Sequence, residues 1–139
     1  ARVLGLVIDG MLEPGNPRGI GNTALLQTPM TSADFASHIA LQLGRQPQLI
    51  PGGPAIIRRV GLCTGGAQGY IDQAIALGLD AYISGEISEQ TVHAARECGI
   101  HYLACGHHAT ERYGVKALGE FLQQETGIAV EFVDIDNPV

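Results

Sequence analysis

The stretch Val60-Gly61-Leu62-Cys63-Thr64-Gly65-Gly66 places a short apolar run directly before a Thr-Gly-Gly turn. The same order returns in Ala81-Tyr82-Ile83-Ser84-Gly85-Glu86 and in His101-Tyr102-Leu103-Ala104-Cys105-Gly106-His107. Apolar runs of this length, bounded by turn residues, are typical of buried strands. Each run is followed by a segment with helical spacing of apolar residues, so the sequence predicts three successive βα units.

The rest of the chain extends this alternation in both directions. Thr31 is a predicted helix N-cap, with Asp34 three residues later and Gly44 as the stop of the same helix. The other expected helices cover residues 67–78, 88–98 and 107–126. The other expected strands cover residues 4–8, 20–26, 46–50 and 129–133, and the second of these is expected to end before Pro29.

Strands that alternate with helices of about three turns favour parallel pairing and right-handed connections. We therefore expect an α/β fold, namely a layered α/β domain with successive βα units and a largely parallel or mixed sheet. The 139 residues are enough for one such domain, covering residues 1–139. The chain enters on an apolar segment without an initiator Met, which indicates a part of a longer protein.

Two sets of side chains are expected to be buried. Val115, Leu118 and Leu122 share one face of the last helix, which is predicted to turn inward. The chain has three cysteines and no CxxC pair, which favours reduced and mostly buried thiols in a cytoplasmic protein; they are Cys63, Cys98 and Cys105.

Composition excludes several classes of partner. The net charge of −6 argues against a general nucleic-acid binder, which needs a basic surface to neutralise phosphates. No apolar run approaches the roughly 18 residues that cross a bilayer, so no membrane association is expected. Hydrophobic residues make up 45% and charged residues 16% of the chain, which indicates a packed core rather than disorder.

The clearest candidate for chemistry follows the third predicted strand. His107 and Glu111 are four residues apart, and a helix places such residues on one face. An imidazole nitrogen and a carboxylate can there reach a common divalent ion such as zinc, manganese or iron. The alternative is an ordinary surface pair, since His-x-x-x-Glu also arises by chance. His108 points about 100° away on a helix and is expected to be a neighbour of the site rather than a ligand.

The other βα junctions should lie at the same edge of the sheet, where such folds bind ligands. Glu86 is a candidate catalytic base or a partner that orients a metal ligand, and the alternative is an acidic residue that stabilises a helix start. Gly65 and Gly66 resemble a phosphate cradle without matching a nucleotide fingerprint. Together with Thr64 they are candidate cofactor-binding or substrate-binding residues.

Three motifs in series resemble one known family. They are Cys63-Thr64-Gly65-Gly66-Ala67-Gln68, Ile83-Ser84-Gly85-Glu86-Ile87-Ser88-Glu89-Gln90-Thr91 and Gly106-His107-His108-Ala109-Thr110-Glu111. Together they resemble the carboxy-terminal half of the Nif-three-like family, whose bacterial members are labelled GTP cyclohydrolase I type 2 homologues, and most of all its YbgI-like branch.

This resemblance implies a protein of two α/β halves with two divalent ions in the cleft between them, assembled as a ring-shaped homohexamer. It implies that His107 is a ligand to one ion and that Glu111 is a bridging carboxylate. The family's other ligands belong to its amino-terminal half, and their His-His-Gly motif is absent here. The chain is thus expected to be the carboxy-terminal part of a two-lobed protein, and two ligands without the rest would hold a metal only weakly.

Three functions are left open. The first is a metal-dependent hydrolase acting on a nucleotide-like substrate, in which a metal ion lowers the pKa of bound water. The second is a non-catalytic assembly or partner-binding protein whose metals are structural or regulatory. The third is a phosphate-binding module centred on Gly65 and Gly66, which predicts an anion at the helix start near Ala67.

Overall fold

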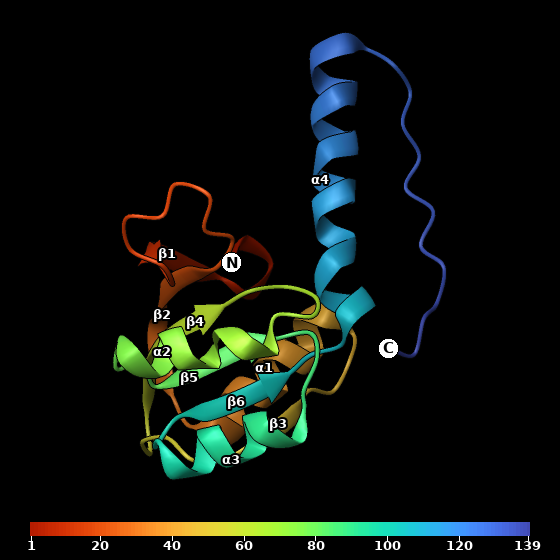
Figure 1. The fold of residues 1–139 in the computed structure, drawn as a ribbon. Helices are drawn as coiled ribbons and strands as arrows, with labels where there is room; N and C mark the ends of the chain where they lie inside the picture. Colours follow the sequence, from red (N-terminus) through yellow and green to blue (C-terminus); the bar gives the residue numbers. More distant parts are fainter.

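The computed structural model describes all 139 residues and contains one six-stranded sheet with helices on both faces (Figure 1). The strand order is β1-β2-β4-β5-β6-β3. The strands are β1 (Leu6–Met11), β2 (Asn22–Met30), β3 (Gln48–Ile50), β4 (Ile57–Leu62), β5 (Ala81–Ser84) and β6 (His101–Ala104). The α-helices are α1 (Ser32–Leu43), α2 (Ile71–Ala76), α3 (Glu89–Glu97) and α4 (His107–Thr126), and single 3-10 turns lie at Arg2–Leu4 and Gln68–Tyr70.

The sheet is mixed, which confirms the predicted α/β fold class. The three strands of the βα units, β4, β5 and β6, run parallel to one another. β1, β2 and β3 join antiparallel at the two sides. β2 continues through Pro29 to Met30, so the prediction that it ends before Pro29 was wrong. The pairing of β2 with β4 shifts register between Leu25 and Met30, and such an irregular stretch tolerates a residue without a backbone N–H.

Alternation along the central strands divides the core between the two faces of the sheet. Ala81 and Ile83 of β5 pack in the cluster that contains Phe35 and Ile39 of α1. Tyr82, between them, packs in the other cluster, with residues of α2 and α3. Because both faces are covered, β5 and β6 are buried along their whole length rather than at alternate residues. The side chains of the central strands are thus divided between the two helical layers that cover the sheet.

Local signals define the ends of α1, α3 and α4 as the sequence predicts, whereas the helix expected over residues 67–78 is shorter, because a 3-10 turn precedes α2. The Thr31 hydroxyl accepts a hydrogen bond from the Asp34 N–H, and Gly44 ends α1 in the left-handed conformation. Ser88 and Thr91 form a reciprocal capping box at the start of α3. α4 ends at Gly127, which also has a positive φ. These helix boundaries come from short-range hydrogen bonds, which is why they could be predicted.

The predicted burial on the last helix was wrong. α4 projects from the sheet (Figure 1), and Ala109 is its only buried residue. The side chains expected to face inward are exposed to 62% at Val115, 56% at Leu118 and 44% at Leu122. The helix is amphipathic as predicted, but beyond its first turns the described chain has no sheet for it to cover.

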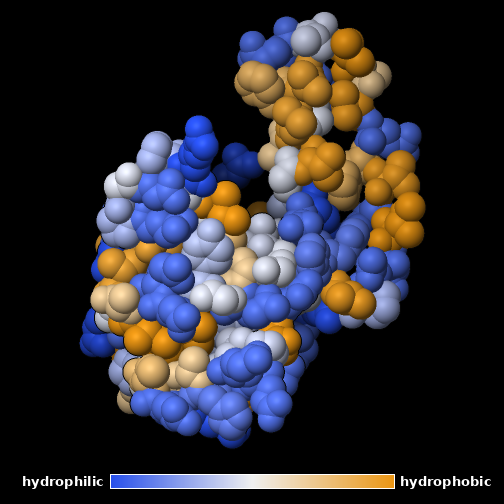
Figure 2. Space-filling model, in the orientation of Figure 1, coloured by the Kyte–Doolittle hydropathy of each residue, from blue (hydrophilic) through white to orange (hydrophobic).

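Two further predictions fail for related reasons. Residues 129–133 form no strand, because they run back alongside α4 (Figure 1), away from any edge of the sheet. Cys98 is exposed at the end of α3, whereas Cys63 and Cys105 are buried as expected. Figure 2 shows apolar side chains gathered over α4 and the segment that follows it. None of the helices combines the length and the apolar character needed to cross a membrane.

Candidate metal centre

The three parallel strands end at one edge of the sheet, and their junctions are tied together there by backbone hydrogen bonds. The Cys63 N–H donates to Ile83 O, the Gly85 N–H to Gly65 O, and the Gly106 N–H to Gly85 O at 2.9 Å. This ladder extends the sheet beyond the strands themselves. It brings the three glycine-containing junctions, which are about 20 residues apart in sequence, into direct contact.

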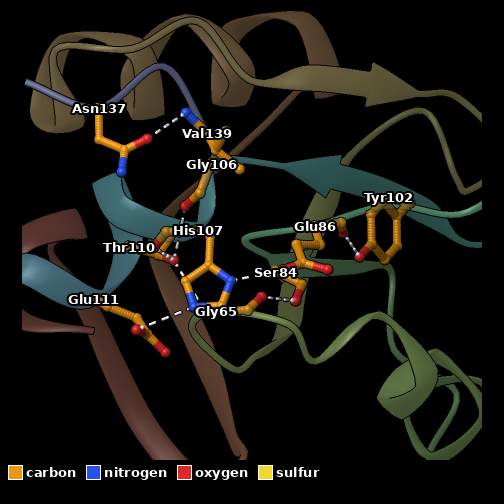
Figure 3. Close-up of polar contacts among 10 residues, drawn as sticks. All are labelled: Gly65, Ser84, Glu86, Tyr102, Gly106, His107, Thr110, Glu111, Asn137 and Val139. Atoms are coloured by element: carbon orange, nitrogen blue, oxygen red, sulfur yellow. Dashed lines mark hydrogen bonds and ion pairs between the residues drawn. The ribbon is translucent and has the colours of Figure 1, made fainter.

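His107 lies at the centre of this edge, as the first residue of α4 (Figure 3). Its Nδ1 atom is 2.6 Å from Oε1 of Glu86, and its Nε2 atom is 3.1 Å from Oε2 of Glu111. Both ring nitrogens thus face a carboxylate. The hydrogen bond with Glu86, supported by the negative charge of Glu111, raises the pKa of the His107 imidazole.

The glycines make room for these side chains. Gly65 has φ +66°, and a Cβ atom there would lie 2.2 Å from Oε1 of Glu111. At Gly85 a Cβ atom would lie 2.9 Å from the Cα of His107. Any larger residue at either position would push a backbone or a carboxylate out of place. The two glycines therefore set how closely the first and second junctions approach α4.

Three residues that the sequence analysis did not single out hold the junctions in place. The Thr110 hydroxyl accepts a hydrogen bond from the Gly65 N–H at 3.0 Å. The Ser84 hydroxyl donates to Gly65 O at 3.2 Å, and the Tyr102 hydroxyl donates to Glu86 O. Thr110 lies within the Gly106–Glu111 motif, so the motif itself was a signal. No signal in the sequence pointed to Ser84 or Tyr102, because both lie in strands whose residues are mostly apolar.

The other predicted site residues lie around this pair. Thr64 borders a cleft of about 680 Å³ together with Glu111, Cys63 and mainly apolar side chains. Burial, and then the charge of Glu111, raises the pKa of the Cys63 thiol, which argues against a nucleophilic role. Gly66 faces Glu86, whose Oε1 atom would be 3.3 Å from a Cβ there. Because the carboxylate of Glu86 is negatively charged, its closeness to Gly66 disfavours binding of an anion there.

His107 and Glu111 fit one edge of a metal site. Bonds of about 2.1 Å from zinc to nitrogen and oxygen place two ligands of one tetrahedral ion about 3.4 Å apart, not far from the 3.1 Å between Nε2 of His107 and Oε2 of Glu111. Glu86 is hydrogen-bonded to the other ring nitrogen, Nδ1, as carboxylates commonly are to histidines that bind a metal ion. Nowhere in the structure do three or more His, Cys, Asp or Glu side chains converge as ligands. The chain thus offers an oriented pair, fewer than the three protein ligands of a usual zinc site.

The comparison with known proteins identifies the family of the chain. The family model of DUF34/NIF3, NGG1p interacting factor 3, matches residues 1–138. The chain belongs to the DUF34/NIF3 family. The resemblance found in its three motifs is therefore confirmed.

Among relatives in this family, a Pseudomonas aeruginosa protein named GTP cyclohydrolase 1 type 2 homolog is 59% identical over 138 residues. That match covers 99% of this chain and 54% of the relative. A solved structure of protein ybgI, described as of unknown function, is 45% identical with a TM-score of 0.93, and the match covers all of this chain and 55% of that one. A Thermus thermophilus structure is 27% identical with a TM-score of 0.83, and the match covers 100% and 54% of the two chains.

The DUF34/NIF3 chain described here thus spans about half the length of the curated relatives it matches. Nearly half of each of those relatives has no counterpart in these 139 residues. The ligand roles of His107 and Glu111, the role of Glu86 and the binding roles of Thr64, Gly65 and Gly66 stay predictions. Their positions around one sheet edge are what the structure adds.

Proposed function

We propose that this DUF34/NIF3 chain supplies a histidine and a carboxylate, His107 and Glu111, to a divalent-metal centre. In the complete protein that centre holds two ions, of zinc, iron or manganese, and hydrolyses a small nucleotide-like substrate. A bound divalent ion supplies Lewis acidity and lowers the pKa of a water molecule. We further propose that the protein acts in the cytoplasm as a homohexamer.

One observation carries this proposal: the His107 ring lies between two carboxylates, with a different role open to each. Glu86 accepts a hydrogen bond from Nδ1–H in the tautomer that leaves Nε2 free to donate its electron pair. Nε2 points toward Glu111 on the same helix face, and the absence of a Cβ atom at Gly65 lets both side chains lie against that glycine without a clash. In this arrangement Glu86 orients the ring, and Glu111 adds the negative charge that a cation needs.

The alternative function is a non-catalytic assembly or partner-binding protein whose metal ions are structural. The observation that favours it is the large exposed apolar surface of α4 and the segment after it, since such surfaces mark contacts with other protein. The two functions differ in metal coordination: a catalytic ion keeps a position open for water, whereas a structural ion is closed by protein ligands.

The test is metal content and metal affinity of the full-length protein, by elemental analysis and by calorimetric titration with Zn²⁺, Mn²⁺ and Fe²⁺. We expect His107→Ala and Glu111→Gln each to lower the metal content. We expect Glu86→Gln to weaken affinity by about 10-fold to 100-fold, as is usual for a group that orients a ligand.

The chain contains a matched control pair on α3. Glu89 and His93 have the same spacing as His107 and Glu111, but they are 4.0 Å apart and largely exposed. His93→Ala and Glu89→Gln should therefore leave metal content unchanged. Normal metal content in both His107→Ala and Glu111→Gln would refute the proposal.

A further inference from the structure

The start of α4 is held by residues more than twenty positions away in sequence. Residues 134–139 return to the base of this helix after running alongside it (Figure 1). The His108 backbone N–H donates to Val139 O at 3.0 Å. Figure 3 shows Val139 beside Gly106, the residue that precedes His107. We call residues 134–139 the strap.

The strap makes a second contact through Asp134. Its Oδ1 atom is 3.2 Å from Nε2 of His108, and its Oδ2 atom accepts a hydrogen bond from Nη1 of Arg112 at 3.0 Å. One carboxylate thus joins two side chains on successive turns of α4. Arg112 in turn donates to Leu43 O at the end of α1, at 2.6 Å. Through Arg112, the strap, α4 and α1 are linked.

Arg45 completes the attachment from the other side. Its Nη1 atom donates to Pro138 O at 2.6 Å. Its guanidinium also lies against Gly106, where a Cβ atom would be 2.6 Å from Nε. Gly106 has φ +91°, so it depends on the absence of a side chain both for its conformation and for the space that Arg45 fills. The turn that aims His107 is thus enclosed by Arg45 and the strap.

We propose that the strap positions the metal-binding face of α4, with Asp134 and Arg45 as positioning residues. This inference rests on the function proposed above. Only Ala109 of α4 is buried, so little apolar packing fixes the angle of this helix to the sheet. We infer that the polar contacts at the base of α4 fix this angle instead. Loosening them allows His107 to move relative to Glu86, which belongs to a different junction, although neither residue is altered.

The experiment compares Asp134→Ala with Asp136→Ala in the full-length protein. Both changes remove one carboxylate from the strap, but Asp136 makes no hydrogen bond or ion pair in the structure. Co²⁺ serves as the probe, because its absorption spectrum reports ligand geometry while titration reports affinity. Hydrogen exchange at the amides of His108 and Thr110 measures the start of α4 without metal.

For Asp134→Ala we expect about tenfold weaker Co²⁺ binding, an altered Co²⁺ spectrum and faster exchange at His108, with an unchanged melting temperature. Asp136→Ala should match the wild type in Co²⁺ affinity, Co²⁺ spectrum, hydrogen exchange at His108 and melting temperature. If the wild-type protein binds no Co²⁺, the proposed function fails. If the wild type binds Co²⁺ and Asp134→Ala binds it equally well with the same spectrum, the strap proposal is overturned while the metal centre stands, even if exchange at His108 is faster.

Discussion

The body of the molecule, residues 1–106, and the arm, residues 107–139, use apolar residues in opposite ways. In the body, α1 has a buried face, and Phe35 and Ile39 are fully covered by the sheet. In the arm, α4 has an apolar face of similar spacing, yet Leu118 and Phe121 are more than half exposed. Amphipathic spacing predicts a helix and the face it would bury, but whether that face is buried depends on a partner.

The candidate metal centre lies where these two regions meet. Glu86 belongs to the body, and Glu111 belongs to the arm. His107, the first residue of the arm, contacts both. The geometry of the site therefore depends on how firmly the arm is attached to the body.

The largest difference should appear between two phenylalanines. Phe35 is fully buried, whereas Phe121 is 57% exposed on α4. Phe35→Ala should lower the free energy of unfolding by about 3–5 kcal/mol, because it removes core contacts and leaves a cavity. Phe121→Ala should change it by no more than about 0.5 kcal/mol. Urea unfolding of this 139-residue chain, followed by circular dichroism, measures both. Equal losses in the two variants would mean that the arm is packed in solution.

A smaller effect of opposite sign is expected from the glycines of α4. A Cβ atom at Gly114 would meet nothing within 4 Å, so Gly114→Ala should stabilise the helix by up to about 1 kcal/mol. At Gly119 a Cβ atom would lie 2.8 Å from Cγ1 of Val130. Gly119→Ala should therefore gain less, because Val130 has to move.

The melting temperatures of these two variants test whether the segment after α4 packs on it. Equal gains in Gly114→Ala and Gly119→Ala would show that Val130 does not rest on the helix in solution. A net loss in Gly119→Ala would show that the contact is tighter than a simple side-chain adjustment allows. Either result would revise how the segment after α4 packs on this helix, and neither would alter the structure described for the body.

The parts of the fold that could be predicted from sequence depend on short-range signals. The caps at Thr31 and Ser88 and the three βα junctions follow from neighbouring residues. The prediction of a strand at residues 129–133 failed, because a strand requires a partner edge and the apolar pattern contains no information about one. The pairing of β3 beside β6 could not be predicted either, since it joins segments about 50 residues apart.

The same division applies to the candidate site. His107 and Glu111 could be paired from their spacing, because one helix determines their geometry. The approach of Glu86 to His107 was expected only in general terms, from the shared edge of the sheet. The contacts of Ser84 with Gly65 and of Tyr102 with Glu86 could not be predicted, since they span 19 and 16 residues and depend on strand register. The strap contacts of Asp134 depend in the same way on the path of the chain in space.

The smallest effect concerns an ion pair at the edge of the body. Asp9 of β1 accepts hydrogen bonds from the Thr23 hydroxyl at 2.6 Å and from Nε of Arg59 at 2.8 Å. These hydrogen bonds lower the pKa of Asp9 below its ordinary value of 3.8, and the bond from Thr23 has the largest effect. A carboxyl group with a lowered pKa stabilises the folded state above the unfolded pKa, and this stability is lost as the pH falls through the folded value.

Asp9→Asn should accordingly lower the free energy of unfolding at pH 7 by less than about 1 kcal/mol, because solvent screens an exposed ion pair. The difference from the wild type should shrink below pH 3.8 and disappear at lower pH. Urea midpoints measured between pH 7 and pH 2 test this, with Asp136→Asn on the arm as the control that makes no such contacts. A penalty for Asp9→Asn that persists at pH 2 would mean that the amide disturbs packing between β1 and β2. A penalty at neither pH would mean that the stability of the edge strand does not depend on this ion pair, as is common for exposed pairs.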